Sequence, residues 1–243
     1  MKELLRKYYR YPAAVTYYLM YLVAFYLLER RVPATLHIIH CSIDQYIPFL
    51  EIFIVPYFFW FAFTAITVLV LFVFDREIMF RMIWIGVIGF SLFLFVSYVY
   101  PNGLDLRPET FARDNVFVDM VKFLYRIDTP TNVLPSLHVF VSTVAAAAVY
   151  RSEVLNKHVI YRRATVVTAV LIILSTMFLK QHSIVDVSMG LLMAYVCNEI
   201  VYEDGIIRGL LRDTEYVLEE AGRVRQMKKK GFLGGRQFDR KES

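Results

Sequence analysis

The chain has 243 residues, of which 58% are hydrophobic and 16% aromatic, and its mean hydropathy is +0.48. Soluble domains are usually about 45–50% apolar, and long apolar runs recur along this chain, so the composition excludes an ordinary soluble protein and predicts an all-α, polytopic membrane protein. The formal net charge of +5 is concentrated near the C-terminus, which favours membrane lipids over nucleic acid as partners.

The hydropathy pattern predicts a bundle of six transmembrane helices. In chain order we expect them at 11–29, 47–74, 82–100, 135–150, 164–179 and 184–202. Within the long polar connection between the third and fourth spans, residues 110–128 have the apolar spacing of an interfacial amphipathic helix. Residues 1–203 would then form the membrane domain, and 204–243 a charged cytoplasmic tail.

The distribution of basic residues predicts the orientation. The termini and the connections 75–81 and 151–163 hold 20 of the 27 Lys and Arg residues. Because cytoplasmic segments carry the excess of Lys and Arg, both termini of this multi-pass cell-membrane protein are expected in the cytoplasm. The connection 101–134 would then lie outside, in the periplasm or the exterior.

Three ionisable residues interrupt an apolar region near the end of the fifth predicted span. Lys180, His182 and Asp186 fall within seven residues, and ionisable groups at a membrane boundary usually have a function. If the segment after Gln181 is helical, His182 and Asp186 form an i,i+4 pair. The carboxylate would fix the imidazole tautomer and leave the second nitrogen free to attack an electrophile. The alternative is a snorkelling lysine beside a capping pair.

Two further segments are expected on the same outer side. Arg107-Pro108 offers a planar guanidinium suited to phosphate oxygens, although alone it is an ordinary loop arginine. Pro135 to His138 opens a span with a hydroxyl and an imidazole at a helix N-terminus, where anions bind. Its alternative is a helix cap followed by a structural histidine. Together the three segments predict a phosphate ester as the substrate.

These motifs carry a resemblance to a known family. Arg-Pro, Pro-Ser-x-His and Ser-x6-His-x3-Asp, within residues 100–190, resemble the type 2 phosphatidic acid phosphatases, or lipid phosphate phosphatases, whose superfamily includes the vanadium haloperoxidases. The resemblance implies an outer-face active site with His182 as the nucleophile of a phosphohistidine intermediate. Asp186 would orient it and His138 would protonate the leaving oxygen. The groups implied to bind phosphate are Arg107, Ser136 and the backbone of Leu137.

The chain departs from the family pattern at two positions. The family has Lys where Tyr100 stands and Arg where Thr176 stands, and Lys180 is the local replacement expected to bind phosphate. Losing such a donor by Lys180→Met is expected to lower turnover about 10²-fold. The segment that ends at His182 is similar to inositol phosphorylceramide synthases, which transfer a phosphoinositol head group.

The sequence therefore leaves three functions open. The first is hydrolysis of a lipid phosphomonoester or diphosphate. The second is head-group phosphotransfer, in which an alcohol replaces water, and the third is a non-catalytic lipid-binding member of the fold. We expect no cofactor and no divalent metal, because fixed positive groups can stabilise the phosphoryl oxygens, and we expect vanadate to inhibit. His37 and His40 form His-x2-His without a convincing further ligand set.

Overall fold

The computed structural model of the protein describes residues 10–33 and 35–202. The predicted tail at 204–243 lies outside the described residues. The described residues up to Asn198 belong to one compact unit, and every site discussed below lies within it.

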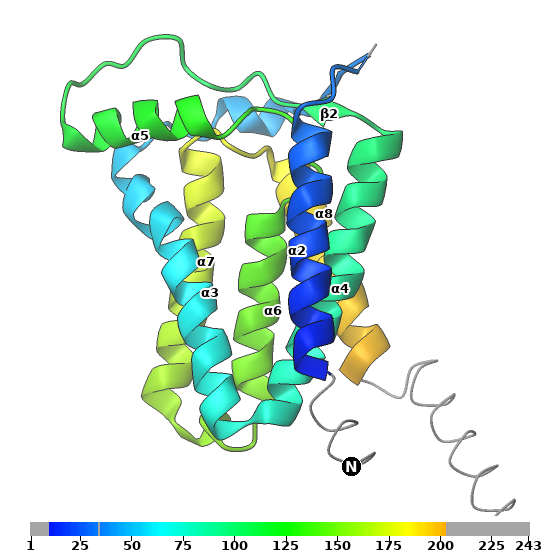
Figure 1. Cartoon of the computed structure of the whole chain (residues 1–243). Helices are drawn as coiled ribbons and strands as arrows, with labels where there is room; N and C mark the ends of the chain where they lie inside the picture. The colour runs from blue at the N-terminus through cyan, green and yellow to red at the C-terminus, as the bar shows by residue number, and fades with distance from the viewer. Residues whose placement is uncertain (1–9, 34, 203–243) are drawn as a thin grey trace, which may run out of the picture. The chain divides into compact units, whose positions relative to one another are not determined.

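Helices make up nearly all the regular structure of the described part of the chain (Figure 1). The α-helices are α2 (Arg10–Glu29), α3 (Ile54–Phe74), α4 (Arg76–Val99), α5 (Val116–Ile127), α6 (Leu137–Arg151), α7 (Val159–Phe178) and α8 (Ile184–Tyr202). Short 3-10 helices occur at Ser42–Gln45, Glu51–Phe53 and Leu155–Lys157. Two short strands, β1 (His37–Ile38) and β2 (Asn102–Gly103), pair in parallel with His37 opposite Asn102. The predicted all-α class is confirmed.

Five helices of the described chain are long and apolar enough to cross a membrane. They are Pro12–Glu29, Glu51–Phe74, Arg76–Val99, Val159–Phe178 and Ile184–Tyr202. The fourth expected span is α6, which is apolar but has only 15 residues. Several long apolar helices are compatible with a membrane protein, as the hydropathy pattern predicts.

Some helix bounds differ from the sequence-based expectation, and for α4 the reason is a polar cap. α4 was expected to begin at 82, but the Asp75 side chain accepts the Ile78 N–H at 3.2 Å and the helix begins at Arg76. Such a cap satisfies one of the free N–H groups of the first turn. α7 likewise begins at Val159 instead of 164. The second expected span begins as a 3-10 turn at Glu51 and becomes α-helical at Ile54.

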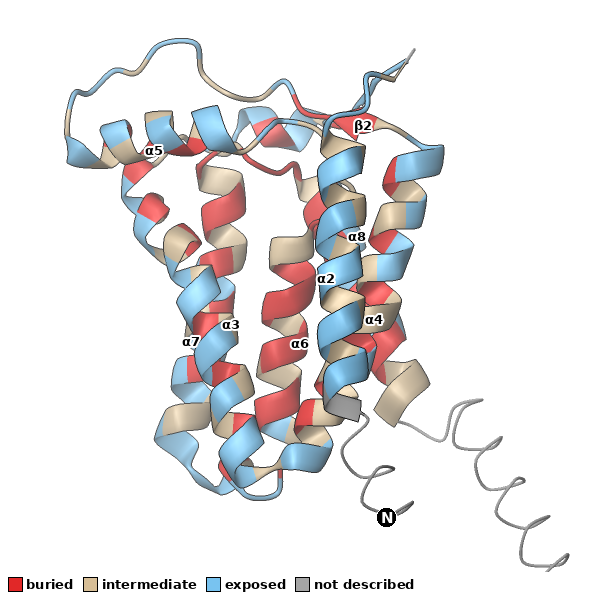
Figure 2. Cartoon of the chain, viewed as in Figure 1, coloured by how far each residue is buried: buried red, intermediate tan, exposed pale blue. Residues whose placement is uncertain are grey.

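α6 is the most buried helix of the bundle (Figure 2). It packs against α7, α4 and α3, and its Val and Ala residues are largely buried. Phe140 is fully buried against Gly89 of α4, where an added Cβ would lie 2.1 Å from its ring. The missing side chain at Gly89 is therefore what allows α4 and α6 to approach. This places the start of α6, with His138, beside its neighbours.

α5 crosses one end of the other helices (Figure 1). Its buried residues Val118, Val121 and Leu124 share one face, and the Asn115 side chain caps the helix by accepting the Val118 N–H at 3.0 Å. Val121 and Leu124 pack in a cluster with residues of α3 and with Leu179. The predicted amphipathic helix is confirmed, although it spans 116–127 and not 110–128.

Candidate active site

The connection between α7 and α8 positions the central histidine. The backbone N–H groups of Gln181 and His182 both donate to the carbonyl of Thr176, at 2.9 and 3.1 Å. Lys180 has a positive φ of 54° in this turn, a left-handed conformation that is uncommon for a residue other than glycine. The chain reverses here, and α8 begins at Ile184, two residues after His182.

His182 and Asp186 are paired, as their i,i+4 spacing predicts. The Nδ1 atom of His182 lies 2.6 Å from Oδ2 of Asp186. Asp186 is fully buried and His182 is 9% exposed. A carboxylate on Nδ1 leaves Nε2 as the nitrogen available for chemistry. The second oxygen of Asp186, Oδ1, has no hydrogen-bond partner.

His138, in the first turn of α6, faces the same region. Its ring centroid lies 5.8 Å from that of His182. The rings of Tyr57 and Trp60 on α3 lie against it, at centroid distances of 4.6 and 4.5 Å. The Tyr57 hydroxyl donates to Asp128 Oδ2 at 3.0 Å, so α3 also meets the end of α5 here.

The N-terminus of α6 is tied directly to α8. The Ser136 N–H donates to the carbonyl of Asp186 at 3.1 Å. Ser136 is fully buried, and its hydroxyl accepts the N–H of Val139 at 3.4 Å. The hydroxyl therefore caps the helix, and the N–H groups that begin α6 at Leu137 remain as the anion-binding feature of this segment.

Both histidines line one cavity of about 90 Å³. Several water molecules occupy such a volume, so a phosphoryl group fits in it. The cavity is lined by Phe25, Glu29, Phe93, Asp128, Thr129, Thr131, Asn132, Val133, Leu137, His138, Gln181 and His182. It joins the start of α6, the α7–α8 turn, the end of α2 and the connection that follows α5.

Arg107 reaches this cavity through Gln181. Its Nη2 donates to Gln181 Oε1 at 2.5 Å, and its guanidinium lies over the Tyr125 ring, 4.5 Å from the centroid. Burial lowers the pKa of the Arg107 guanidinium from its very high ordinary value. Gln181 is only 4% exposed, lines the cavity, and has no partner for its amide nitrogen. That nitrogen is a donor for an oxygen of a bound anion.

The phosphate contact expected for Lys180 stays a prediction, but the structure gives its ammonium other partners. Its ammonium donates to the backbone carbonyls of Asp44 and Ile47, at 2.9 and 2.6 Å, and Lys180 does not line the cavity. The physical reason is that two backbone carbonyls, one in the 3-10 helix Ser42–Gln45 and one just after it, lie within reach of the side chain. The sequence did not place that segment beside the α7–α8 turn.

Tyr100 and Thr176 stand where the family has a lysine and an arginine. Neither residue lines the cavity. Tyr100 stacks on His37 with ring centroids 4.2 Å apart. Thr176 is fully buried, and its hydroxyl donates to the Ile173 carbonyl at 2.7 Å. The donors at this cavity therefore include the Gln181 amide, the start of α6 and the two imidazoles, and no lysine or arginine lines it among the described residues.

The Asp44 side chain binds the end of the α7–α8 turn through hydrogen bonds. It is 1% exposed, and its carboxylate accepts the Ser183 hydroxyl at 2.6 Å, the Ile184 N–H at 2.9 Å and the Cys41 N–H at 2.8 Å. Burial opposes its ionisation, but these hydrogen bonds and the charge of Lys180 outweigh burial and hold the pKa of the Asp44 carboxyl below its usual range. Asp44 thus caps α8 just before Asp186.

Sequence reasoning missed Asp44, Asp128 and Gln181. Gln181 is adjacent to His182, and its polarity beside an apolar span was a usable signal. Asp44 and Asp128 lie in connections, and no local pattern distinguished them from solvated loop carboxylates. Glu51, in the 3-10 turn before α3, is 5% exposed and accepts hydrogen bonds from Arg113 at 2.9 Å and Asn115 at 3.1 Å.

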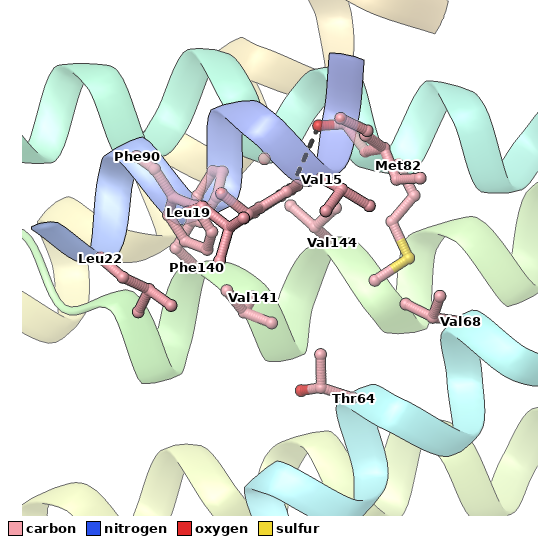
Figure 3. A pocket seen from close by; sticks show the side chains of 14 residues that line it. Val15, Leu19, Leu22, Thr64, Val68, Met82, Phe90, Phe140, Val141 and Val144 are labelled. Atoms are coloured by element: carbon pink, nitrogen blue, oxygen red, sulfur yellow. Dashed lines mark hydrogen bonds between the residues drawn. The ribbon is translucent and has the colours of Figure 1, made fainter. Parts of the chain in front are cut away.

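An apolar groove of about 420 Å³ lies between α2, α3, α4 and α6 (Figure 3). Leu22 of α2, Phe90 of α4 and Phe140 of α6 line it. The neighbouring residues Phe25 and Phe93 line the cavity that holds the two histidines and pack against each other, with ring centroids 6.0 Å apart. α2, α4 and α6 therefore contribute side chains to both spaces.

Among the described residues, no group of three or more His, Cys, Asp and Glu side chains is placed to hold a metal ion. In the comparisons with known proteins, the chain matches no protein-family model, no curated protein and no solved structure. The resemblance to the lipid phosphate phosphatases therefore rests on the motif residues themselves.

Proposed function

We propose that the protein is an integral membrane lipid phosphatase that hydrolyses a lipid phosphomonoester or diphosphate. The observation that carries this proposal is a single cavity lined by two imidazoles, one of which is paired with a buried carboxylate. In the proposed topology α6 is the fourth of six spans, both termini are cytoplasmic and the cavity opens at the outer face of the cell membrane.

The proposed mechanism has two steps. In the first, Nε2 of His182 attacks phosphorus, an N–P bond forms, and the bond to the lipid oxygen breaks as His138 gives that oxygen a proton. In the second, water attacks phosphorus, the N–P bond breaks, and the proton of the water passes to His138. Asp186 stabilises the positive charge on His182 during the first step.

Fixed donors would stabilise the phosphoryl oxygens in both steps. The buried amide nitrogen of Gln181 lacks a partner, and Arg107 fixes the orientation of that amide by binding its oxygen. The N-terminus of α6 contributes further N–H groups. Preorganised donors of this kind typically contribute about 10²–10³-fold in rate each.

The apolar groove supports a lipid as the substrate. It is lined almost entirely by hydrocarbon groups, including Leu22, Phe90 and Phe140 (Figure 3). A hydrocarbon chain that leaves the catalytic cavity along α2 and α4 would enter this groove. Membrane lipids are then both the surroundings and the source of the substrate.

A second candidate function is head-group phosphotransfer to an alcohol. The observation that favours it is that Glu29 and Asp128 line the catalytic cavity. Carboxylates oppose a phosphomonoester dianion but accept hydrogen bonds from hydroxyl groups. An alcohol would then replace water in the second step.

The test is to incubate the purified protein in detergent with a panel of lipid phosphates and diphosphates and to measure release of inorganic phosphate. We expect release that vanadate inhibits and EDTA does not. Activity that EDTA abolishes and Mg²⁺ restores would contradict the proposed chemistry. If no substrate yields phosphate or a transferred phosphate ester, the protein is a non-catalytic lipid-binding member of the fold.

A cysteine-labelling experiment tests the proposed topology. An impermeant reagent added from outside should label a cysteine placed in 101–134 and should not label one placed in 151–163. The reverse pattern would contradict both the orientation and the outer-face site.

A further inference from the structure

A second cavity of about 290 Å³ adjoins the catalytic cavity. The two cavities share four lining residues: Glu29, Thr129, Thr131 and Asn132. Hydrogen bonds join these residues into one wall. Glu29 accepts from the Asn132 amide at 2.6 Å and from the Thr129 hydroxyl, and the hydroxyls of Thr129 and Thr131 lie 2.8 Å apart. A molecule in the second cavity would therefore contact the same four residues as a group bound beside the histidines.

Ser97 supplies an independent sign that the second cavity takes a ligand. Ser97 lies near the end of α4, lines the second cavity and is only 1% exposed. Its hydroxyl has no hydrogen-bond partner. A buried hydroxyl without a partner is costly, and native structures contain few of them. A bound group that forms a hydrogen bond with Ser97 would remove this cost.

The lining of the second cavity is suited to hydroxyl groups. It combines a carboxylate acceptor, an amide and three hydroxyls that both donate and accept, from Glu29, Asn132, Ser97, Thr129 and Thr131. A ligand hydroxyl also donates and accepts, whereas an ammonium group only donates. The negative charge of Glu29 disfavours a second phosphate group.

Arg31 also lines the second cavity, but its guanidinium is already engaged. It donates to the Tyr98 carbonyl at 2.8 Å and lies 4.7 Å from the centroid of the Tyr98 ring. The cation is therefore held by the end of α4. This arrangement leaves the hydroxyl, amide and carboxylate groups as the recognition elements.

We propose that the second cavity binds a small polyol, such as glycerol or a cyclitol, and presents one of its hydroxyls to the phosphohistidine. This inference rests on the proposed function. The polyol oxygen forms a bond to phosphorus and the N–P bond to His182 breaks. The hydroxyl proton passes to His138, which gave its own proton to the lipid oxygen in the first step. The product is the phosphate ester of the polyol, and water is the competing acceptor.

The test uses the full-length protein in detergent with a short-chain lipid phosphate, and glycerol, inositol, ethanol or ethanolamine at equal concentration. The measured quantity is the ratio of transferred phosphate ester to inorganic phosphate. We expect the ratio for the better polyol to exceed that for ethanol at least tenfold. Ser97→Ala should lower the polyol ratio at least fivefold. If Ser97→Ala does not fold, Thr131→Val should lower it in the same way.

Ser142→Ala is the matched control, because Ser142 is a fully buried serine of α6 whose hydroxyl also lacks a partner. It should leave the ratio unchanged. Phosphate release with equal ratios for polyol and ethanol would overturn this inference and leave the phosphatase proposal intact. A higher ratio for ethanolamine than for either polyol would assign the cavity to an ammonium group instead. The absence of both products with every substrate would overturn the proposed function itself.

Discussion

Two polar turns of this protein lie at the two ends of α7. They differ in whether their buried polar side chains have hydrogen-bond partners. In the turn at 152–158, the Ser152 hydroxyl donates to Asp75 at 2.7 Å, and Asn156 accepts from Arg162 at 2.6 Å. In the turn at 179–183, Gln181 is buried with an unpartnered amide nitrogen, and the nearby Asp186 has an unpartnered oxygen. Among the described residues, no buried side-chain atom of the 152–158 turn lacks a partner.

The difference shows that polarity in a turn does not by itself mark a site. Both turns carry a histidine and a lysine, but only the 179–183 turn contributes side chains to the cavity that holds His138. Unpartnered buried donors and acceptors cost free energy, and a polar group bound in an adjoining cavity would remove that cost. The 152–158 turn therefore supplies matched controls for variants in the 179–183 turn.

The largest expected effect comes from removing the nucleophile. His182→Ala should lower phosphate release by about 10⁴-fold or more, because the proposed mechanism forms the covalent intermediate on this residue alone. His158→Ala, in the exposed part of the other turn, should retain normal turnover. Phosphate release per folded molecule measures both. Comparable losses in the two variants would remove the distinction between the turns.

The second effect concerns Arg107. Arg107→Met should lower turnover about 10²–10³-fold, since the Gln181 amide would lose the partner that orients its donor toward the cavity. Gln181→Leu should show a loss of similar size, and the double variant should lose little more than either single one. Fully additive losses in this double-mutant cycle would show that the two side chains act independently.

Asp44→Asn tests how the 179–183 turn is held. Three hydrogen bonds to an ionised, buried carboxylate are weakened, so we expect a loss of about 2–3 kcal/mol in the free energy of unfolding. The folded-state pKa of Asp44 lies below its unfolded value. The stabilisation is therefore complete above the unfolded pKa of about 3.9 and is lost as the pH falls through the folded value.

Thermal unfolding in detergent from pH 7 to pH 3 measures this effect. The difference in Tm between wild type and Asp44→Asn should be constant near neutral pH and should shrink at the acidic end. A difference that stays constant to pH 3 would show that ionisation of Asp44 does not contribute to the stability.

The smallest effect is expected for Lys180. Because its ammonium binds two backbone carbonyls, Lys180→Met should cost about 2 kcal/mol of stability and change turnover per folded molecule less than about 10-fold. Lys157→Met in the other turn, where the lysine is exposed, should change neither. A loss of turnover of 10²-fold or more, without a change in Tm, would restore the direct phosphate contact expected from the sequence.

The sequence predicted the features that depend on local pattern. Apolar periodicity located the helices, and i,i+4 spacing predicted the contact between His182 and Asp186. Features that depend on distant segments could not be predicted. Lys180 donates a hydrogen bond to the backbone of Asp44, which is more than 130 residues away in the sequence. No periodic pattern in the sequence predicts such a contact. The cavity that holds the two histidines is also lined by Glu29 at the end of α2, and the local sequence there indicates only a helix terminus.

The measurement that tests the central claim most directly is the detection of the covalent intermediate. The protein is mixed with a ³²P-labelled lipid phosphate, quenched under alkaline conditions and digested. We predict that the label is stable to alkali, labile to acid and located on the peptide that contains His182. The His182→Ala variant should not be labelled. Continued phosphate release without any labelled histidine, or with the label on another residue, would contradict the proposed role of His182.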